Sequence, residues 1–253
     1  MVNIIKDTND ILEYVEQKAK ISIRCLGSRD KAEFSFRNYA LTYHKEHNLF
    51  VIHYYEEFPD QVYGLAQEAV RILRAKQALK KDTLFPYASK VGVKKACLQL
   101  KKDYKALKIP HSQRALAFRH DYFTLMHLLG TIPGNCWITT WIYKKSPALK
   151  KASMMILEYL YSEKILGFSF SDEKRIPKKI FKATMSIKAA YALFLDRLLK
   201  QDKYFVPFKT TPYASIARTL VALNDKDRGV KGDIEVAKKW AAVLGVKGWF
   251  LWG

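Results

Sequence analysis

The first eighty residues change twice between a helical and a strand-like spacing of apolar positions. Apolar residues first recur every three or four positions behind Thr8 and Asn9, which we expect to cap a helix. Three segments with alternating apolar and polar residues, rich in β-branched and aromatic types, then predict strands at residues 21–26, 32–44 and 48–55. Helical spacing returns after Pro59. The pattern predicts a small α-β-β-β-α module over residues 1–80.

Beyond residue 80 the helical period dominates, so we expect a mainly α protein. Ser146 followed by Pro147 is typical of a helix start, and this helix is expected to run to about Lys164 before another begins near Pro177. The uncharged stretch 122–143 predicts two short buried helices around a turn at its Pro-Gly pair, rather than a membrane span. The predicted divisions are a basic helical region at 81–145, a unit at 146–210 and a helical C-terminal segment at 211–253.

The charge is distributed unevenly and points to a polyanionic partner. Lys and Arg number 44 against 24 acids, a formal net charge of +20. Residues 1–60 carry 8 basic and 10 acidic residues, so the remainder carries a net charge of +22. A field of one sign attracts polyanions, of which the phosphate backbone is the commonest in cells. Nucleic acid is the expected partner, with duplex DNA favoured over RNA; an anionic membrane or protein, or no polyanion, are the alternatives.

The cysteines and the N-terminus predict an intracellular protein, cytoplasmic or nucleoid-associated. Cys25, Cys97 and Cys136 are far apart, which disfavours a disulfide scaffold or a cysteine zinc site. Acidic residues stand near the N-terminus where a signal peptide needs an apolar run. We expect no metal, no cofactor and no membrane partner.

The element order of the N-terminal module resembles that of double-stranded-RNA-binding domains. The resemblance implies basic residues at the start of the second helix, where this chain has Pro59, Asp60 and Gln61. The segment is also close to neutral. We therefore expect the module to serve packing or dimerisation.

Residues 85–109 resemble a helix-turn-helix. Ala88 would be the small residue where two helices cross, Gly92 would lie in the turn, and Val91, Val93, Leu98 and Leu100 would pack. The resemblance implies that Lys94 and Lys95 enter the major groove. Further nucleic-acid contacts are expected from the same basic segment, at Lys90, Lys101 and Lys102. An ordinary helical hairpin with a solvated lysine-rich face is the alternative.

Residues 149–208 resemble the core of a winged-helix domain. Its second helix would be residues 176–184, followed by a turn, a recognition helix at 186–202 and a strand at 203–208. The resemblance implies that Ser186, Lys188 and Ala189 face the groove while Lys178, Lys179 and Lys182 meet phosphates. Winged helices also bind proteins, so this fold does not by itself specify DNA contact.

The chain ends in an aromatic tail that includes Trp249, Phe250 and Trp252. We expect it to dock on the protein core or on a protein partner. Stacking on a single-stranded base is the alternative. Ala241 and Gly245 repeat the small-residue and glycine spacing of a helix-turn-helix, but too few residues follow for a second helix.

The enzyme interpretations are weaker. His111 and Arg114, then Leu129 and Gly130, then Tyr143 echo the motif order of tyrosine recombinases. The resemblance requires a further arginine and a lysine upstream and a chain that ends soon after the tyrosine. The histidines around the predicted hairpin, His44, His47 and His53, have no clear carboxylate partner for a metal. No phosphate-binding glycine motif is present.

Together these observations predict a sequence- or structure-dependent DNA-binding protein of the replication-initiator or transcription-regulator type, not an enzyme. The alternative is a backbone-binding structural or assembly component of an RNA or nucleoprotein complex. A tyrosine-recombinase-like strand-transfer enzyme is the third class.

Overall fold

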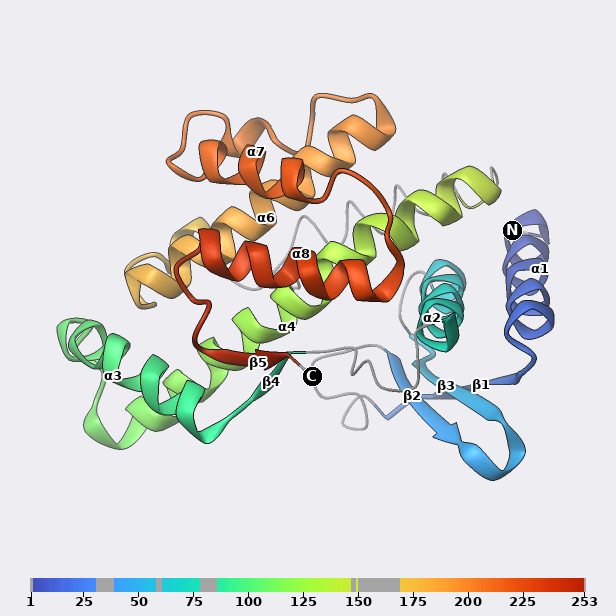
Figure 1. The fold of residues 1–253 in the computed structure, drawn as a ribbon, viewed down its shortest axis with the longest axis horizontal. Coiled ribbons are helices and arrows are strands. Elements are labelled where there is room, and N and C mark those ends of the chain that lie inside the picture. Colours follow the sequence, from blue (N-terminus) through green and yellow to red (C-terminus); the bar gives the residue numbers. More distant parts are fainter. Residues whose placement is uncertain are drawn as a thin grey trace. The chain divides into compact units, whose positions relative to one another are not determined.

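The computed structural model describes residues 2–30, 39–57, 61–77, 86–146, 149 and 169–252. The chain divides into two compact units (Figure 1). The first unit comprises Met1–Lys80 and Trp137–Tyr159, and the second comprises Lys81–Cys136 and Leu160–Gly253. In the described residues the protein is mainly α-helical, with a three-stranded sheet near the N-terminus, as the sequence predicts.

The first unit has the predicted α-β-β-β-α order. Its elements are α1 (Val2–Ala19), β1 (Ser22–Ser28), β2 (Tyr39–His44), β3 (Leu49–Tyr55) and α2 (Gln61–Gln77). The strand order is β1-β3-β2, with β1 parallel and β2 antiparallel to β3. A single 3-10 turn (Lys45–His47) joins β2 to β3, and Asn48 closes it with a left-handed φ of 48°. The hairpin predicted around His44 and His47 is therefore confirmed.

Helices α1 and α2 lie side by side on one face of this sheet (Figure 1). Val15 of α1, Ile52 of β3 and Ala66 of α2 have no exposed surface. The predicted cap at Thr8 is wrong, because α1 begins at Val2 and Thr8 lies inside it. The buried Thr8 hydroxyl donates a hydrogen bond to the carbonyl of Val62 at 3.1 Å, so it joins α1 to α2.

The second unit is mainly helical and includes a two-stranded sheet. It contains α3 (Lys90–Ala106), the first part of α4 (His111–Lys145), α6 (Lys178–Leu199), α7 (Tyr213–Leu223), α8 (Gly229–Val243) and the antiparallel pair β4 (Pro86–Ala88) and β5 (Phe250–Trp252). Short 3-10 turns occur at Phe170–Asp172 and Val206–Phe208. Trp240 of α8 is buried and its Nε1 donates to the carbonyl of Leu220 at 2.8 Å, which fixes α8 against α7.

The prediction of two short helices around a turn at residues 131–135 is wrong, because α4 continues through Pro133. A proline inside a helix removes one backbone donor and crowds the carbonyl four residues earlier. Burial outweighs that penalty, since Leu129, Ile132 and Cys136 are almost wholly buried. The Pro133 carbonyl also accepts a hydrogen bond from Asn224 Nδ2 at 3.2 Å.

The helix predicted from Ser146 to Lys164 falls almost entirely outside the described residues. Ser146 itself is buried, and its hydroxyl accepts a long hydrogen bond from the Leu149 amide at 3.4 Å, the arrangement of a helix cap. Among the helices described, none has a stretch long and apolar enough to cross a membrane.

Candidate nucleic-acid interface

The candidate interface begins where β4 leads into α3. Ser89 caps α3: its backbone is extended (φ −105°, ψ 152°), and its hydroxyl accepts a hydrogen bond from the Gly92 amide at 2.9 Å. The helix-turn-helix prediction is wrong here, because Ala88 lies in a strand and Gly92 lies in the first turn of α3. Gly92 is needed for a close approach, since a Cβ there would overlap the carbonyl oxygen of Trp249.

The two faces of α3 differ sharply. Its buried residues are spaced four apart: Gly92, Ala96, Leu100 and Tyr104. Val91 and Leu98, predicted to pack, are instead 78% and 64% exposed. With about 100° of rotation per residue, both lie on the side of α3 opposite the buried line. The prediction failed because it considered only that these residues are apolar, and not which side of the helix they occupy.

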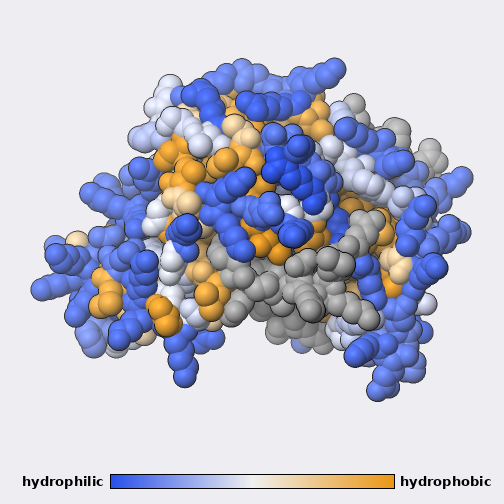
Figure 2. All heavy atoms as spheres, in the orientation of Figure 1, coloured by the Kyte–Doolittle hydropathy of each residue, from blue (hydrophilic) through white to orange (hydrophobic). Residues whose placement is uncertain are grey.

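Lysines flank these two apolar residues in two columns. Lys95 and Lys102 lie on one side, and Lys94, Lys101 and Lys105 on the other, all exposed. The whole of α3 is described, and its one acid, Asp103, is half-buried on the inner side. Figure 2 shows hydrophobic residues within an otherwise hydrophilic surface over α3. We call the seven residues Val91, Lys94, Lys95, Leu98, Lys101, Lys102 and Lys105 the α3 outer face.

The start of α6 lies beside α3. Lys179 Nζ donates to Gln99 Oε1 at 2.9 Å, and the same oxygen accepts from Trp249 Nε1 at 3.0 Å. Lys179 Nζ also lies 5.4 Å from the centre of the Trp249 ring. Lys178 and Lys182, on the same turns of α6, are exposed, as is Lys90 at the start of α3. The structure thus brings Lys179, predicted within the winged-helix segment, against α3 through Gln99, a residue that no sequence pattern singled out.

The winged-helix arrangement predicted around α6 is wrong. One unbroken helix replaces the predicted helix, turn and recognition helix. Ser186 and Ala189, predicted to face the groove, have no exposed surface, and the Ser186 hydroxyl donates to the carbonyl of Lys182 at 2.8 Å. Lys188 is only 9% exposed, and burial lowers its pKa to about 8, although the nearby Asp172 carboxylate opposes this shift. These three side chains lie in the core of the unit.

The aromatic tail docks on its own unit, which is one of the outcomes that the sequence predicts. Trp249 is fully buried and Phe250 is 4% exposed. The carbonyl of Trp249 accepts a hydrogen bond from the Tyr122 hydroxyl at 2.6 Å, and β5 pairs with β4. The start of the tail is set by Gly245 (φ 71°), which ends α8 with the Val246 amide bonded to the Ala241 carbonyl. The tail therefore supports α3 from behind.

A polar cluster around the buried Tyr104 and Asp121 anchors the other end of α3. The Tyr104 hydroxyl donates to Asp121 Oδ2 of α4 at 2.7 Å, and His120 Nδ1 lies 3.2 Å from Asp121 Oδ1. Burial raises the pKa of Asp121, and burial together with this hydrogen bond raises the pKa of Tyr104. Helix α3 is therefore held to the rest of its unit at both ends.

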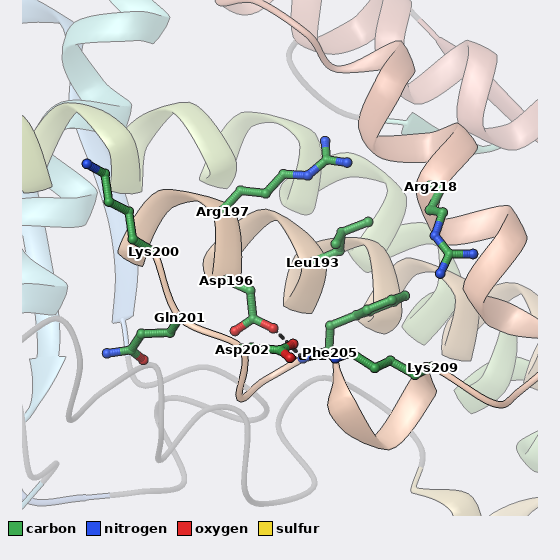
Figure 3. A pocket seen from close by; sticks show the side chains of 9 residues that line it. All are labelled: Leu193, Asp196, Arg197, Lys200, Gln201, Asp202, Phe205, Lys209 and Arg218. Carbon is green, nitrogen blue, oxygen red and sulfur yellow. Dashed lines mark hydrogen bonds and ion pairs between the residues drawn. The ribbon is translucent and has the colours of Figure 1, made fainter.

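A second cationic region surrounds an open pocket of about 420 Å³ at the C-terminal end of α6 (Figure 3). Its lining includes Arg197, Lys200, Lys209 and Arg218. Asp196, which points toward the following loop, accepts hydrogen bonds from three backbone amides, those of Lys203, Tyr204 and Phe205. Cations are favourable near a helix C-terminus, so a structural role accounts for part of this charge.

The recombinase-like residues are spread along one element. His111 and Arg114 lie in the first turn of α4, and Tyr143 lies in its last turn. The Arg114 side chain donates to the carbonyl of Ile109 at 2.9 Å, which closes the loop before the helix. Among the described residues no three His, Cys, Asp or Glu side chains are grouped to hold a metal ion.

Comparison of the chain with protein families, with characterised proteins and with solved structures finds no match.

Proposed function

We propose that this protein binds the phosphate backbone of duplex nucleic acid, with DNA favoured, through the α3 outer face and the neighbouring start of α6. The observation that carries the proposal is the pair of exposed lysine columns on α3 with no acid between them. Lysine is a flexible point charge suited to phosphate contact, and such contacts supply most of the affinity of non-specific binding.

A purely solvated face explains this arrangement less well. Surfaces that only confer solubility usually mix both signs of charge. On α3 like charges instead stand four residues apart at Lys90 and Lys94, and again at Lys101 and Lys105. Each such pair destabilises a helix by about 0.2–0.5 kcal/mol. A bound polyanion would remove this repulsion.

The burial of Ser186, Lys188 and Ala189 favours backbone binding over base recognition by α6. Residues that contact base edges must be accessible, whereas phosphate contacts need only exposed cations. A backbone-binding component of a nucleoprotein complex thus becomes the leading form of the proposal, ahead of a sequence-specific regulator that recognises bases through α6.

The test compares two variants with four substitutions each. One changes Lys94, Lys95, Lys101 and Lys102 to Gln. The control changes four exposed lysines of the same unit outside α3 and α6, namely Lys174, Lys200, Lys226 and Lys231. Binding of a labelled 20-bp duplex of random sequence is followed by fluorescence anisotropy at several salt concentrations.

We expect the slope of log affinity against log salt to become less steep in the α3 variant, by about 3–4, because each phosphate that a lysine neutralises contributes about −0.9 to this slope. The control should change that slope by less than about 1. Equal effects of both variants would mean that total charge, rather than this face, determines binding, and would contradict the proposed site.

A further inference from the structure

Two apolar residues, Val91 and Leu98, lie at the centre of the α3 outer face. Val91 and Leu98 are seven residues apart, so they lie about 10 Å from each other along the helix. They are among the most exposed large apolar side chains described. Lysines alone would suffice for phosphate, so contact with the backbone does not explain this apolar line.

The dimensions of the face match a groove of DNA. A helix with its side chains is about 10–12 Å across, and the major groove of B-form DNA is about 12 Å wide. A helix lying in that groove presents its central line to the base edges and its two flanks to the two phosphate strands. On α3 the central line is apolar and both flanks are lysine.

From this geometry, and resting on the proposed function, we infer that α3 lies in the major groove of B-form DNA. Val91 and Leu98 contact base edges, Lys95 and Lys102 contact the phosphates of one strand, and Lys94, Lys101 and Lys105 contact those of the other. Gly92, packed against the backbone of Trp249, keeps the inner side of the helix against the protein.

This docking specifies the kind of nucleic acid. The only apolar group on the major-groove edge of a base pair is the methyl group of thymine, so Val91 and Leu98 should favour thymine. The major groove of A-form RNA is too deep and narrow for side chains to contact its bases. The inference therefore predicts a preference for thymine-containing DNA over both uracil-containing DNA and duplex RNA.

The experiment measures affinity for three 20-bp duplexes of one mixed sequence: normal DNA, DNA in which deoxyuridine replaces every thymidine, and RNA. We expect the deoxyuridine duplex to bind about fourfold more weakly for each thymine methyl group that would otherwise meet Val91 or Leu98. RNA should bind at least about tenfold more weakly than DNA, because only its phosphates are reached. All measurements use the full chain at one salt concentration.

Two variants test the residues. Val91→Ala with Leu98→Ala should bind normal DNA as weakly as it binds deoxyuridine DNA, so the difference between the duplexes disappears. Leu116→Ala is the matched control, because Leu116 is a 70% exposed apolar residue of α4. It should preserve the difference. Unfolding midpoints of both variants should stay near that of the unchanged protein, because these side chains are exposed.

The outcomes separate the two proposals. If the deoxyuridine and thymidine duplexes bind equally well, or if the double variant keeps the difference, the major-groove inference is overturned and backbone binding stands. If RNA binds as tightly as DNA, the inference is likewise overturned. If none of the three duplexes binds, the proposed function fails as well.

Discussion

Replacing Asp196 by Ala removes the group that holds the loop after α6. The Asp196 side chain accepts hydrogen bonds from the amides of Lys203 at 3.1 Å, Tyr204 at 2.9 Å and Phe205 at 2.9 Å, and the residue is only 6% exposed. Without the carboxylate these three amides lose this acceptor. The bonds that hold the loop to α6 through Asp196 are then removed together.

The magnitude follows from the number and the type of these bonds. A hydrogen bond to a charged group contributes about 1.5–3 kcal/mol, and bonds that share one acceptor do not add fully. We expect the free energy of unfolding to fall by about 3 kcal/mol or more. In Asp196→Asn the remaining carbonyl oxygen can still serve Lys203 and Tyr204, so about half of that decrease should be recovered.

Urea unfolding followed by circular dichroism measures this effect. The control is Asp202→Ala, because Asp202 is exposed and its ion pair with Lys209 should contribute at most about 1 kcal/mol. If Asp196→Ala destabilises the protein no more than Asp202→Ala does, the carboxylate does not hold the loop and this reasoning is refuted.

Three smaller predictions concern the support of α3 and the core of α6. Gly92→Ala should lower the free energy of unfolding by about 1–3 kcal/mol in urea titrations, because its Cβ would displace the Trp249 backbone; unchanged stability would contradict that packing. Ser89→Ala should destabilise by about 1 kcal/mol because it removes the α3 cap, which the same titration measures. Burial lowers the pKa of Lys188 to about 8 in the folded protein. Above that pH the unfolded chain therefore binds more protons than the folded chain does. Unfolding free energy should therefore rise between pH 8 and 10.5 by up to about 3 kcal/mol relative to Lys188→Met; parallel pH profiles would contradict this.

The N-terminal module was predictable because its signals are local. Strand alternation and helical spacing each extend over several residues, and the polar turn between β2 and β3 has one simple interpretation. The error at Thr8 arose because a hydroxyl that caps a helix and one that bonds to a neighbouring helix look alike in the sequence.

The continuity of α4 and α6 could not be predicted from local signals. Pro133 and its glycine neighbour are typical of a turn, and only the burial around them explains why the helix continues. In α6 the helical spacing of apolar residues continues through the predicted turn. The winged-helix resemblance nevertheless led to the prediction of two helices there. Lys188 was assigned to a surface because lysines are rarely buried.

The sequence predicts which lysines belong to the candidate site, but not how the residues around them are arranged. The lysines of α3 were predicted from the helix-turn-helix resemblance and from the local charge, and all of those named are exposed. The exposure of Val91 and Leu98 depends on which side of α3 packs on the core. Gln99 contacts Lys179 and Trp249, which lie 80 and 150 positions away from it in the sequence. A single sequence contains no signal for contacts over such distances.

The central claim is that this protein binds nucleic acid through phosphate contacts, and the salt dependence of binding tests it most directly. Affinity of the full chain for a 20-bp random DNA duplex should be measured between 50 and 200 mM salt. With about six lysines at phosphates, the slope of log affinity against log salt should be about −5, a decrease of roughly a thousandfold over that range. A slope near zero, or no binding at 50 mM salt, would contradict the claim.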